Sequence, residues 1–375
     1  MRIHYVSHAA IPSREANSLQ VMKMCAAFAR AGHTVVHFCR PGPEAGDAHA
    51  FYGLAPSFRI ERVAGGGLPI VRRLRRAWRL AARLAREPVP DLVYGRDFHS
   101  LALLALRGRL VAPLVLEVHQ PPRNRLEHAL QLRLFRQPGF ARLVCISAAL
   151  AEEYRRRFGP ELGAPLVVAP DGADEPAEPA PAAARANGLA LGYVGHLYPG
   201  KGLELIERLA ARLPRCAFHV LGGEAGDVAA WRARLARPNV HLHGHVPHAE
   251  AQRRMRAFDV LLAPYQAAVL IGGGGSDVSR WMSPLKVFEY MASGRPMIAS
   301  DLPVLREVLR DGENALLARA DDVEAWARAV ERLEADPDLA RRLAERALAE
   351  LRARYTWDRR VELVLAAPSS SLLAP

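Results

Sequence analysis

Lysine is rare in this sequence, and two of its three lysines lie where a phosphate could bind. Only Lys23, Lys201 and Lys286 occur among 51 lysines and arginines. The rest are arginines, and with the many alanines this composition is typical of a GC-rich genome. Lysine supplies a compact point charge and arginine a planar fork, so the retained lysines are candidates for a specific role.

Lys201 belongs to a glycine-rich stretch, 195–202, with the sequence GHLYPGKG. It lies between an apolar strand-like segment and an amphipathic helical one. Glycines permit close backbone approach, and the start of the next helix offers free amides to an anion. A tight turn with an exposed lysine is the structural alternative. The spacing resembles a P-loop, but Gly202 stands where magnesium coordination needs Ser or Thr, which disfavours a nucleoside triphosphatase.

Lys286 belongs to the stretch 283–294, with the sequence SPLKVFEYMASG. We expect Ser283 to be the N-cap of a helix, Pro284 its first residue and Gly294 its end. Lys286 then lies in the first turn, where the helix dipole disfavours a cation unless an anion is bound there. A pyrophosphate fits this position, and Glu289 could accept hydrogen bonds from an attached ribose. The alternative is a surface Lys–Glu pair.

Short apolar strands alternate with amphipathic helices along the whole chain, which predicts an α/β protein with two doubly wound parallel-sheet domains. Strands are predicted at 2–7, 34–39, 92–95, 114–119, 143–146, 166–169, 189–194, 217–221, 240–243, 260–263 and 296–299. Helices are predicted at 18–30, ended by Gly32, and at 203–213, 228–236, 248–257 and 284–292. The Pro- and Ala-rich stretch 174–188 is predicted to be a tether. The stretch 271–276, with four glycines, is predicted to be a loop, either beside a site or on plain surface.

Length and composition narrow the class of protein. A chain of 375 residues suits two domains, and its net charge of +12 predicts an anionic partner. The N-terminus lacks a leader pattern and no apolar stretch approaches about 20 residues, so we expect a cytoplasmic protein. Four separated cysteines predict buried thiols. No nucleic-acid module is present, and we expect no nucleic-acid partner.

These motifs, in this order, resemble the retaining GT-B glycosyltransferases of family 4, also called group 1. The resemblance rests in the second half on 195–202, 244–246, 264–265, 283–294, 300–303, Glu307, 311–312 and 355–357. In the first half it rests on 31–35, 117–119, 146–147 and 170–172. It implies two Rossmann-like domains that face a central cleft: an acceptor-side domain at 1–173, a donor domain at 174–350, and a last helix at 351–375 that crosses back to the first domain.

The resemblance also implies roles for individual residues. Lys201 would bind the donor diphosphate, Glu289 the nucleotide ribose, and backbone near Val246 the base. His119 would lie across the cleft near the donor sugar, although a lone histidine after a strand also suits a structural role. The implied catalytic residues are His119, Lys201 and Glu289. The implied donor-binding residues are Gly195, His196, Lys201, Val246, Ser283, Pro284, Leu285, Lys286 and Glu289, and the acceptor-side residues are Asn17, Ser18 and His119.

The implied reaction moves a hexosyl group from a nucleotide-diphosphate sugar to a glycan or lipid-linked acceptor with retention of configuration. No metal or other cofactor is expected, because the only D-x-D spelling, at 336–338, lies between late helices and suits a cap or turn. A GT-B nucleotide-sugar epimerase and a non-catalytic nucleotide-sugar binder remain alternatives.

The sequence departs from the family pattern at three places. His196 stands where the family usually has arginine, which makes that charge titratable. Trp281 stands where many members have a second glutamate that contacts the donor sugar. The residues 15–18 replace the paired glycines of the first strand–helix loop.

The segment 71–86 predicts a basic amphipathic helix. One stripe carries arginines and another carries apolar residues: Arg72, Arg76, Arg79, Arg83 and Arg86 on the first, and Leu74, Trp78 and Ala81 on the second. Such a helix suits an anionic membrane surface that presents a lipid-linked acceptor, and thus a peripheral location at the inner face of the membrane. An ordinary solvated face is the alternative.

Overall fold

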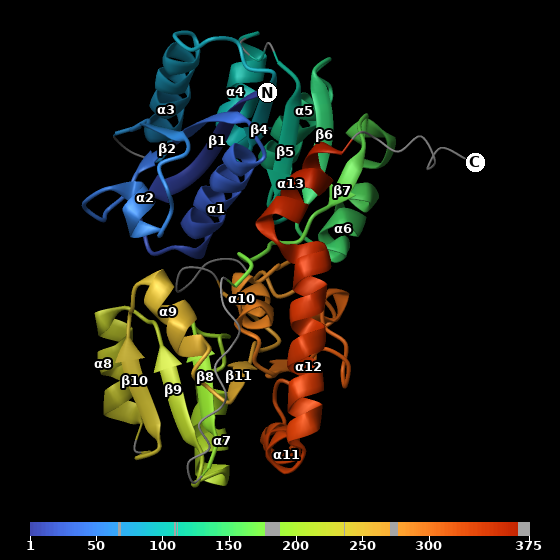
Figure 1. Ribbon diagram of the computed structural model, residues 1–375. Coiled ribbons are helices and arrows are strands. Elements are labelled where there is room, and N and C mark those ends of the chain that lie inside the picture. The colour runs from blue at the N-terminus through green and yellow to red at the C-terminus, as the bar shows by residue number, and fades with distance from the viewer. Residues whose placement is uncertain are drawn as a thin grey trace. The chain divides into compact units, whose positions relative to one another are not determined.

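The computed structural model describes residues 1–66, 69–108, 110, 112–176, 188–235, 237–270 and 277–366. It divides into two compact units (Figure 1). The first contains Met1–Pro170 and the residues from Trp357 onward, and the second contains Asp171–Thr356. The expected boundaries lay after residues 173 and 350. Most of the expected tether at 174–188 and all of the expected loop at 271–276 lie outside the described residues.

The first unit is built on a seven-stranded parallel sheet with the order β3-β2-β1-β4-β5-β6-β7. The strands are β1 (Arg2–Ile11), β2 (Thr34–Pro41), β3 (Arg59–Arg62), β4 (Leu92–Gly95), β5 (Leu114–Val118), β6 (Phe140–Cys145) and β7 (Leu166–Val168). The helices are α1 (Ala16–Arg30), α2 (Ala48–Phe51), α3 (Pro69–Leu84), α4 (Phe98–Leu106), α5 (Arg125–Phe135), α6 (Ala148–Phe158), the 3-10 turn η1 (Gly159–Leu162) and α13 (Trp357–Leu365).

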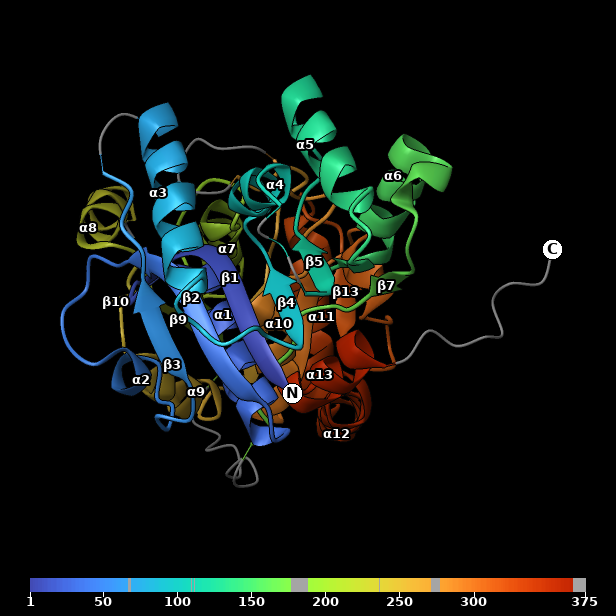
Figure 2. The same cartoon turned by 90° about the horizontal axis from the view of Figure 1, so that it is seen from above.

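Helices of the first unit lie on both sides of its sheet (Figure 2). Helix α4 contacts α3 and α5 on one side, and α13 packs against α1 on the other. The Arg30 guanidinium of α1 donates to the Asp358 carboxylate of α13 at 2.8 and 3.0 Å, and Arg142 at β6 donates to the Val364 carbonyl. The last helix of the chain therefore completes the first unit.

The second unit is built on a six-stranded parallel sheet with the order β10-β9-β8-β11-β12-β13. The strands are β8 (Ala190–Val194), β9 (Ala217–Leu221), β10 (Val240–Gly244), β11 (Val260–Ala263), β12 (Met297–Ser300) and β13 (Leu316–Ala318). The helices are α7 (Leu203–Arg212), α8 (Ala225–Arg234), α9 (His248–Met255), α10 (Leu285–Ser293), α11 (Val323–Ala335) and α12 (Pro337–Glu350), with η2 (Leu305–Glu307) and the π-helical turn η3 (Leu351–Tyr355).

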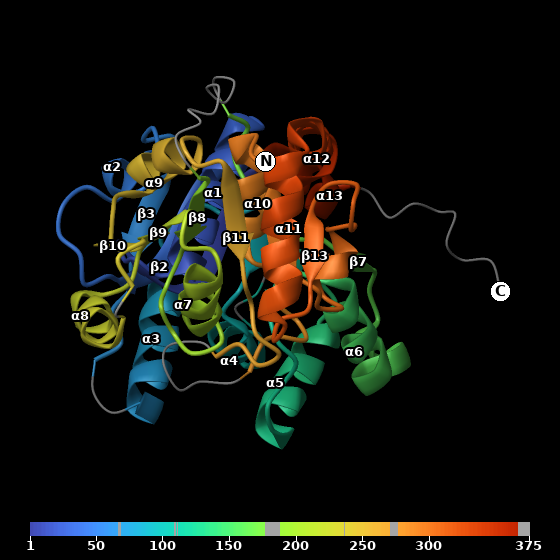
Figure 3. The same ribbon diagram turned by 90° about the horizontal axis from the view of Figure 1, so that it is seen from below.

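Alternate residues of the central strands enter two separate apolar clusters, so both faces of this sheet are covered. Leu262 of β11 and Ile298 of β12 join a cluster with Trp326 of α11. Their chain neighbours Leu261 and Met297 join a second cluster that includes α10. Figure 3 shows α7 and α11 side by side over the sheet, and the two helices are in contact.

Both units have the strand order of a doubly wound nucleotide-binding fold, as predicted. The order reverses between β1 and β4 in the first unit and between β8 and β11 in the second. Ligands of such sheets bind beyond the carboxyl ends of the strands at that reversal. Lys201 follows β8, and Tyr265 follows β11. The second reversal therefore brings together the glycine-rich stretch and the end of β11.

Two further expectations can be compared with the structure. The four cysteines are buried free thiols, as predicted. Among the residues described, no helix combines the length and the apolar character needed to span a bilayer. The strands β3 and β13, which lie at the edges of their sheets, were not predicted from the sequence.

The Gly202 backbone gives a test of how the glycine-rich stretch is built. Gly202 is the N-cap of α7 with a φ of 92°, and a Cβ added there would lie 1.9 Å from the Pro264 carbonyl oxygen. We therefore predict that Gly202→Ala lowers the free energy of unfolding by about 1–3 kcal/mol, from overlap and backbone strain together.

Gly226 in α8 is the matched control, because a Cβ there would have no atom within 4 Å. Its φ is not in the left-handed region, so Gly226→Ala is expected to raise stability by about 0.5–1 kcal/mol. Urea unfolding of both variants measures the difference. Equal effects of the two substitutions would contradict the steric argument.

Candidate functional site

Two ammonium groups of the second unit lie on one buried tyrosine ring. The Nζ atom of Lys286 lies 3.7 Å from the ring centroid of Tyr193 and 5.0 Å from that of Tyr265. The Nζ atom of Lys201 lies 5.1 Å from the same Tyr265 ring. Lysines 85 residues apart in the chain thus converge at the reversal of strand order, as the phosphate hypothesis requires.

Lys286 is buried, and among the described residues its Nζ has no hydrogen-bond partner. The glycine-rich stretch lies directly over it, since a Cβ added to Gly195 would lie 2.9 Å from that Nζ. The Tyr193 hydroxyl fixes this stretch by donating to the His196 carbonyl at 2.6 Å. A cation without an acceptor beneath a glycine backbone is an arrangement that suits an anionic ligand.

The electrostatics of this cluster show a deficit of negative charge. Burial lowers the pKa of Lys201 to about 8. Burial, and next the charge of Lys201, hold the pKa of Lys286 well below its usual value, although Glu289 opposes this. Burial and both lysines also lower the pKa of His196. An anion bound here would favour the charged form of all three side chains.

Helix α10 begins one residue later than predicted. Ser283 is not the N-cap, because its hydroxyl accepts the Asp171 backbone N–H at 2.8 Å. Pro284 is the N-cap residue and the helix begins at Leu285. Gly294 ends the helix in the left-handed conformation, as predicted. The backbone N–H groups of Leu285 and Lys286 open the helix, where no intrahelical acceptor is available.

The Glu289 carboxylate does not pair with Lys286. Its Oε1 lies 2.7 Å from Nε2 of His248, the first residue of α9, and Lys286 is buried. The surface Lys–Glu alternative is therefore wrong. Sequence reasoning missed His248, which lies 41 residues from Glu289. Its place directly after the turn that carries Val246 was the available signal.

The remaining predicted residues of this unit each pack against a different partner. The Val246 side chain is half-buried and packs against the apolar cluster that includes α10. The His196 ring stacks on Tyr198 at 4.8 Å. Trp281, at the position of the missing glutamate, is half-buried with the Arg280 guanidinium 4.9 Å from its ring. The roles assigned to these residues stay predictions.

His119, in the first unit, belongs to a buried network centred on the Glu117 carboxylate. Oε1 of Glu117 lies 2.6 Å from His119 Nε2 and 3.3 Å from Arg96 Nε, and Oε2 accepts from Arg360 at 2.9 Å. Tyr94 and Gln20 also donate to this carboxylate. The Glu117 side chain is 0% exposed, whereas that of His119 is 29% exposed.

The protonation of this network follows from its charges. Burial would raise the pKa of Glu117, but Arg360, His119 and Arg96 together lower it well below its usual value. Burial and Arg96 lower the pKa of His119 to about 4 despite the hydrogen bond to Glu117. A neutral imidazole that donates from Nε2 to Glu117 leaves Nδ1 as an acceptor. His119 can thus accept a proton or a hydrogen bond from a hydroxyl.

The two predicted acceptor-side residues near the start of α1 differ in exposure. Ser18 is fully buried, and its hydroxyl donates to the Ala10 carbonyl at 3.0 Å. Asn17 is only partly buried. The Ser18 side chain is therefore engaged inside the unit, and Asn17 is the one of the pair that reaches its surface.

Helix α3 also differs from the predicted pattern. Arg76 does not belong to the exposed arginine stripe, because it is buried and pairs with Asp97 and the Ser7 carbonyl. Val71, Leu74 and Trp78 are 40%, 50% and 64% exposed. The apolar residues at the i, i+3 and i+7 positions therefore lie on the outer face of the helix.

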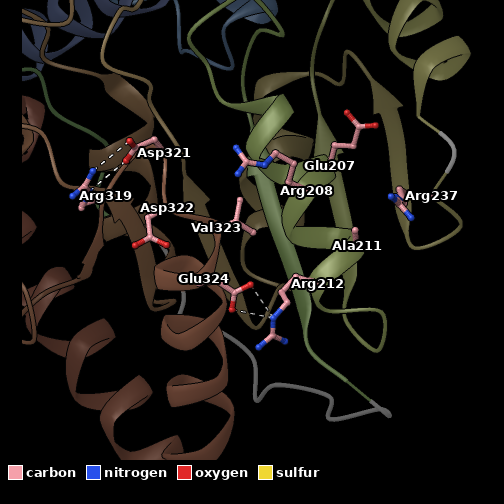
Figure 4. A pocket seen from close by; sticks show the side chains of 10 residues that line it. All are labelled: Glu207, Arg208, Ala211, Arg212, Arg237, Arg319, Asp321, Asp322, Val323 and Glu324. Carbon is pink, nitrogen blue, oxygen red and sulfur yellow. Dashed lines mark hydrogen bonds and ion pairs between the residues drawn. The ribbon is translucent and has the colours of Figure 1, made fainter.

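A wide groove of the second unit, of about 1030 Å³, lies apart from these residues in the fold. It is lined by α7 and by the segment that leads from β13 into α11 (Figure 4). Arg212 pairs with Glu324 at 3.1 Å and Arg319 with Asp321 at 3.4 Å. None of the predicted site residues lines it, and much of its charge is balanced within it.

Within the described part of the chain, no group of three or more His, Cys, Asp or Glu side chains is arranged to hold a metal ion. Asp336, in the D-x-D spelling, caps α12 by accepting the Leu339 N–H at 2.8 Å, as predicted. The expectation that no metal is required stays a prediction.

Solved structures share the fold of the whole chain. Sucrose-phosphate synthase from Thermosynechococcus elongatus matches with a TM-score of 0.72, 19% identity and coverage of 96% of each chain. HepE from Anabaena, in complex with UDP and glucose, matches with a TM-score of 0.72, 16% identity and coverage of 98% of this chain and 100% of that one. With two parallel-sheet α/β units, these matches define the GT-B fold.

Sequence comparison places the chain within that class. The family model described as Glycosyltransferase Family 4 matches residues 19–176, and the model described as Glycosyl transferase-like matches residues 202–366. Each half of the chain therefore matches a glycosyltransferase family model, and the two matches together span most of its length.

Curated relatives match shorter stretches. The D-inositol 3-phosphate glycosyltransferase of Nocardia farcinica is 32% identical over 207 residues, which are 51% of this chain and 44% of that protein. The phosphatidyl-myo-inositol mannosyltransferase of Mycolicibacterium smegmatis is 28% identical over 164 residues, 43% of this chain and 39% of that protein. The chain thus matches about two fifths of the length of these relatives.

The network around Glu117 gives a stability test. Arg360 is 2% exposed and neutralises the buried carboxylate, so Arg360→Met is expected to lower the free energy of unfolding by about 3–5 kcal/mol. Arg359 is exposed and pairs with Glu362, so Arg359→Met is expected to leave the free energy of unfolding nearly unchanged. Thermal and urea unfolding measure both, and similar losses would contradict the role of the network.

Proposed function

We propose that this protein is a glycosyltransferase that takes a hexosyl group from a nucleotide-diphosphate sugar, with a UDP-hexose as the first candidate. The observation that carries the proposal is the pair of ammonium groups on the Tyr265 ring, one from half-buried Lys201 and one from buried Lys286. They stand where a doubly wound sheet binds phosphate. The matches to two glycosyltransferase family models support the proposal, and HepE, which has a similar fold, binds UDP-glucose in one solved structure.

The leaving nucleoside diphosphate gains negative charge as the glycosidic bond to the donor breaks. In the proposed mechanism, Lys201, Lys286 and the first amides of α10 stabilise that charge, which lowers the barrier electrostatically. Glu289 accepts hydrogen bonds from the ribose. We propose retention of configuration by attack on the face from which the diphosphate leaves, without a metal, because the lysines and amides already supply positive charge to the leaving group.

The acceptor is proposed to be a glycan or a lipid-linked glycan. His119 of the first unit is proposed to accept a hydrogen bond at Nδ1 from a substrate hydroxyl, because its Nε2 is engaged by Glu117. Asn17 is proposed to contact the acceptor. The protein is proposed to act in the cytoplasm.

A panel of nucleotide sugars, with and without acceptors, tests the activity. Release of nucleoside diphosphate that requires an acceptor supports transfer. Interconversion of donor sugars would instead show an epimerase. Binding of a nucleotide sugar without turnover in the presence of every acceptor tested would support a non-catalytic binder. The anomeric configuration of the product, read by NMR coupling constants, tests retention, and an EDTA arm tests metal independence.

The lowered pKa of Lys201 predicts a pH dependence of diphosphate binding. As pH rises through about 8, Lys201 loses its proton and its attraction for the ligand, so the affinity for UDP should fall. Binding near neutral pH should also take up protons, because a bound anion raises the pKa of both lysines. Calorimetry from about pH 7 to 9.5, in buffers of different ionisation enthalpy, measures both effects.

Lys201→Arg provides the control, since arginine keeps its charge throughout this range. The pH dependence of this variant should be flatter, even where its affinity at neutral pH is lower. An identical decline of affinity with pH in both proteins would show that another group titrates.

We further propose that α3 binds an anionic membrane surface, where a lipid-linked acceptor is available. The helix has no acidic residue, and the exposed row of Val71, Leu74 and Trp78 is flanked by exposed arginines. The Arg107 guanidinium lies 6.0 Å from the Trp78 ring and adds to this basic surface. Exposed apolar residues between arginines suit a lipid interface, whereas a solvated face has no need of them.

Vesicle sedimentation tests this surface. The wild type should bind vesicles rich in phosphatidylglycerol at low salt and release them at high salt, and neutral vesicles should bind weakly. Trp78→Ser should reduce binding about 10- to 150-fold, from the loss of roughly 1.5–3 kcal/mol of apolar burial. Leu126→Ser on α5, 69% exposed in the wild type, is the matched control and should bind normally. Equal losses in both variants would contradict the proposal.

A further inference from the structure

The carboxylate of Glu289 is held from a second helix. His248 Nε2 lies 2.7 Å from Glu289 Oε1, and the two side chains are 20% and 13% exposed. Glu289 belongs to α10 and His248 begins α9. A long glutamate side chain has considerable rotamer freedom, and this contact restricts it before any ligand arrives.

The residues just before His248 link this contact to the turn assigned to the nucleotide base. Gly244 ends β10 with a φ of 74°, and its carbonyl accepts the Gly222 N–H at 2.7 Å. Val246 follows in the same turn, and Pro247 is the N-cap of α9. One short segment therefore carries both the proposed base contact and the partner of the proposed ribose ligand.

The chemistry of the pair leaves Glu289 able to bind a diol. An imidazole that donates from Nε2 uses one of about four acceptor positions of the carboxylate. Oε2 and the second lone pair of Oε1 remain for two hydroxyl donors. Because the carboxylate is already fixed, the ligand loses less free energy in ordering it.

We propose that His248 is a positioning residue of the nucleotide site, which orients Glu289 toward the 2′,3′-diol of a ribonucleotide and so disfavours a 2′-deoxyribonucleotide. This role rests on the proposed function, because it requires a nucleoside diphosphate beside Lys201 and Lys286. It adds a residue on α9 to a site otherwise built from α10 and the glycine-rich stretch.

Calorimetric titration with UDP and 2′-deoxy-UDP tests the role, and GDP with 2′-deoxy-GDP serves as a second pair if uridine is not the base. The wild type should prefer the ribonucleotide. His248→Ala should weaken ribonucleotide binding about 5- to 20-fold, as expected when a long side chain must be ordered by the ligand. It should weaken 2′-deoxyribonucleotide binding much less, so the preference between the two sugars should fall.

Three further variants separate positioning from folding. His248→Gln should restore most of the preference, because its side-chain amide can donate at a similar reach. Glu289→Gln should remove the preference in the same way as His248→Ala. His241→Ala, at an exposed histidine of β10, should behave as wild type.

Three results would overturn the role. An unchanged preference in His248→Ala, with or without a lower melting temperature, would show a structural contact only. Tighter ribonucleotide binding by that variant would show that His248 competes with the ribose for Glu289. Failure of the wild type to bind UDP or GDP would overturn the proposed function itself, and this role with it.

Discussion

The second unit of the protein depends on an unbalanced burial of positive charge. Two ammonium groups lie on the Tyr265 ring, and Lys286 Nζ has no hydrogen-bond partner among the described residues. A cation–π contact stabilises such a group by only about 0.5–2 kcal/mol, which is less than the cost of removing an ammonium from water. Burial therefore disfavours the charged form of both lysines and lowers their pKa values, and an anion bound beside them would favour that form.

The topology of the sheet and the contacts of two loops position Lys286. Reversal of strand order between β8 and β11 leaves a space beyond the strand ends that neither crossover helix fills. The glycine-rich stretch crosses this space with Gly202 in the left-handed region, close to the Pro264 carbonyl. The contact between Ser283 and Asp171 fixes the start of α10 from outside the helix. Lys286 is thus placed by three separate segments.

Local patterns in the sequence were sufficient for much of this fold. The strands at 92–95, 217–221 and 260–263 have the predicted bounds, and Gly294 ends α10 as its conformational freedom predicts. Contacts between segments far apart in the chain could not be predicted from local sequence patterns. The Ser283 hydroxyl accepts an amide 112 residues away instead of capping α10. The Glu289 carboxylate contacts His248, a residue that the sequence did not indicate as its partner. Arg76, which was predicted to belong to an arginine stripe on the helix surface, is buried and pairs with Asp97. In each case a tertiary partner overrode the local pattern.

Each unit buries one ionisable side chain that can be compared with the other, Glu117 in the first unit and Lys286 in the second. The comparison separates a structural role from a ligand-binding role. Glu117 is fully buried, yet donors from β4, α1, α13 and His119 satisfy its carboxylate within the first unit. Such a charge needs no ligand, and its effect is to orient the half-exposed His119 ring. Lys286 is also buried, but it lies against the Tyr193 and Tyr265 rings and near the Lys201 charge. Among the described residues its donors stay unsatisfied, and this contrast with Glu117 is the reason that we propose an anionic ligand for Lys286.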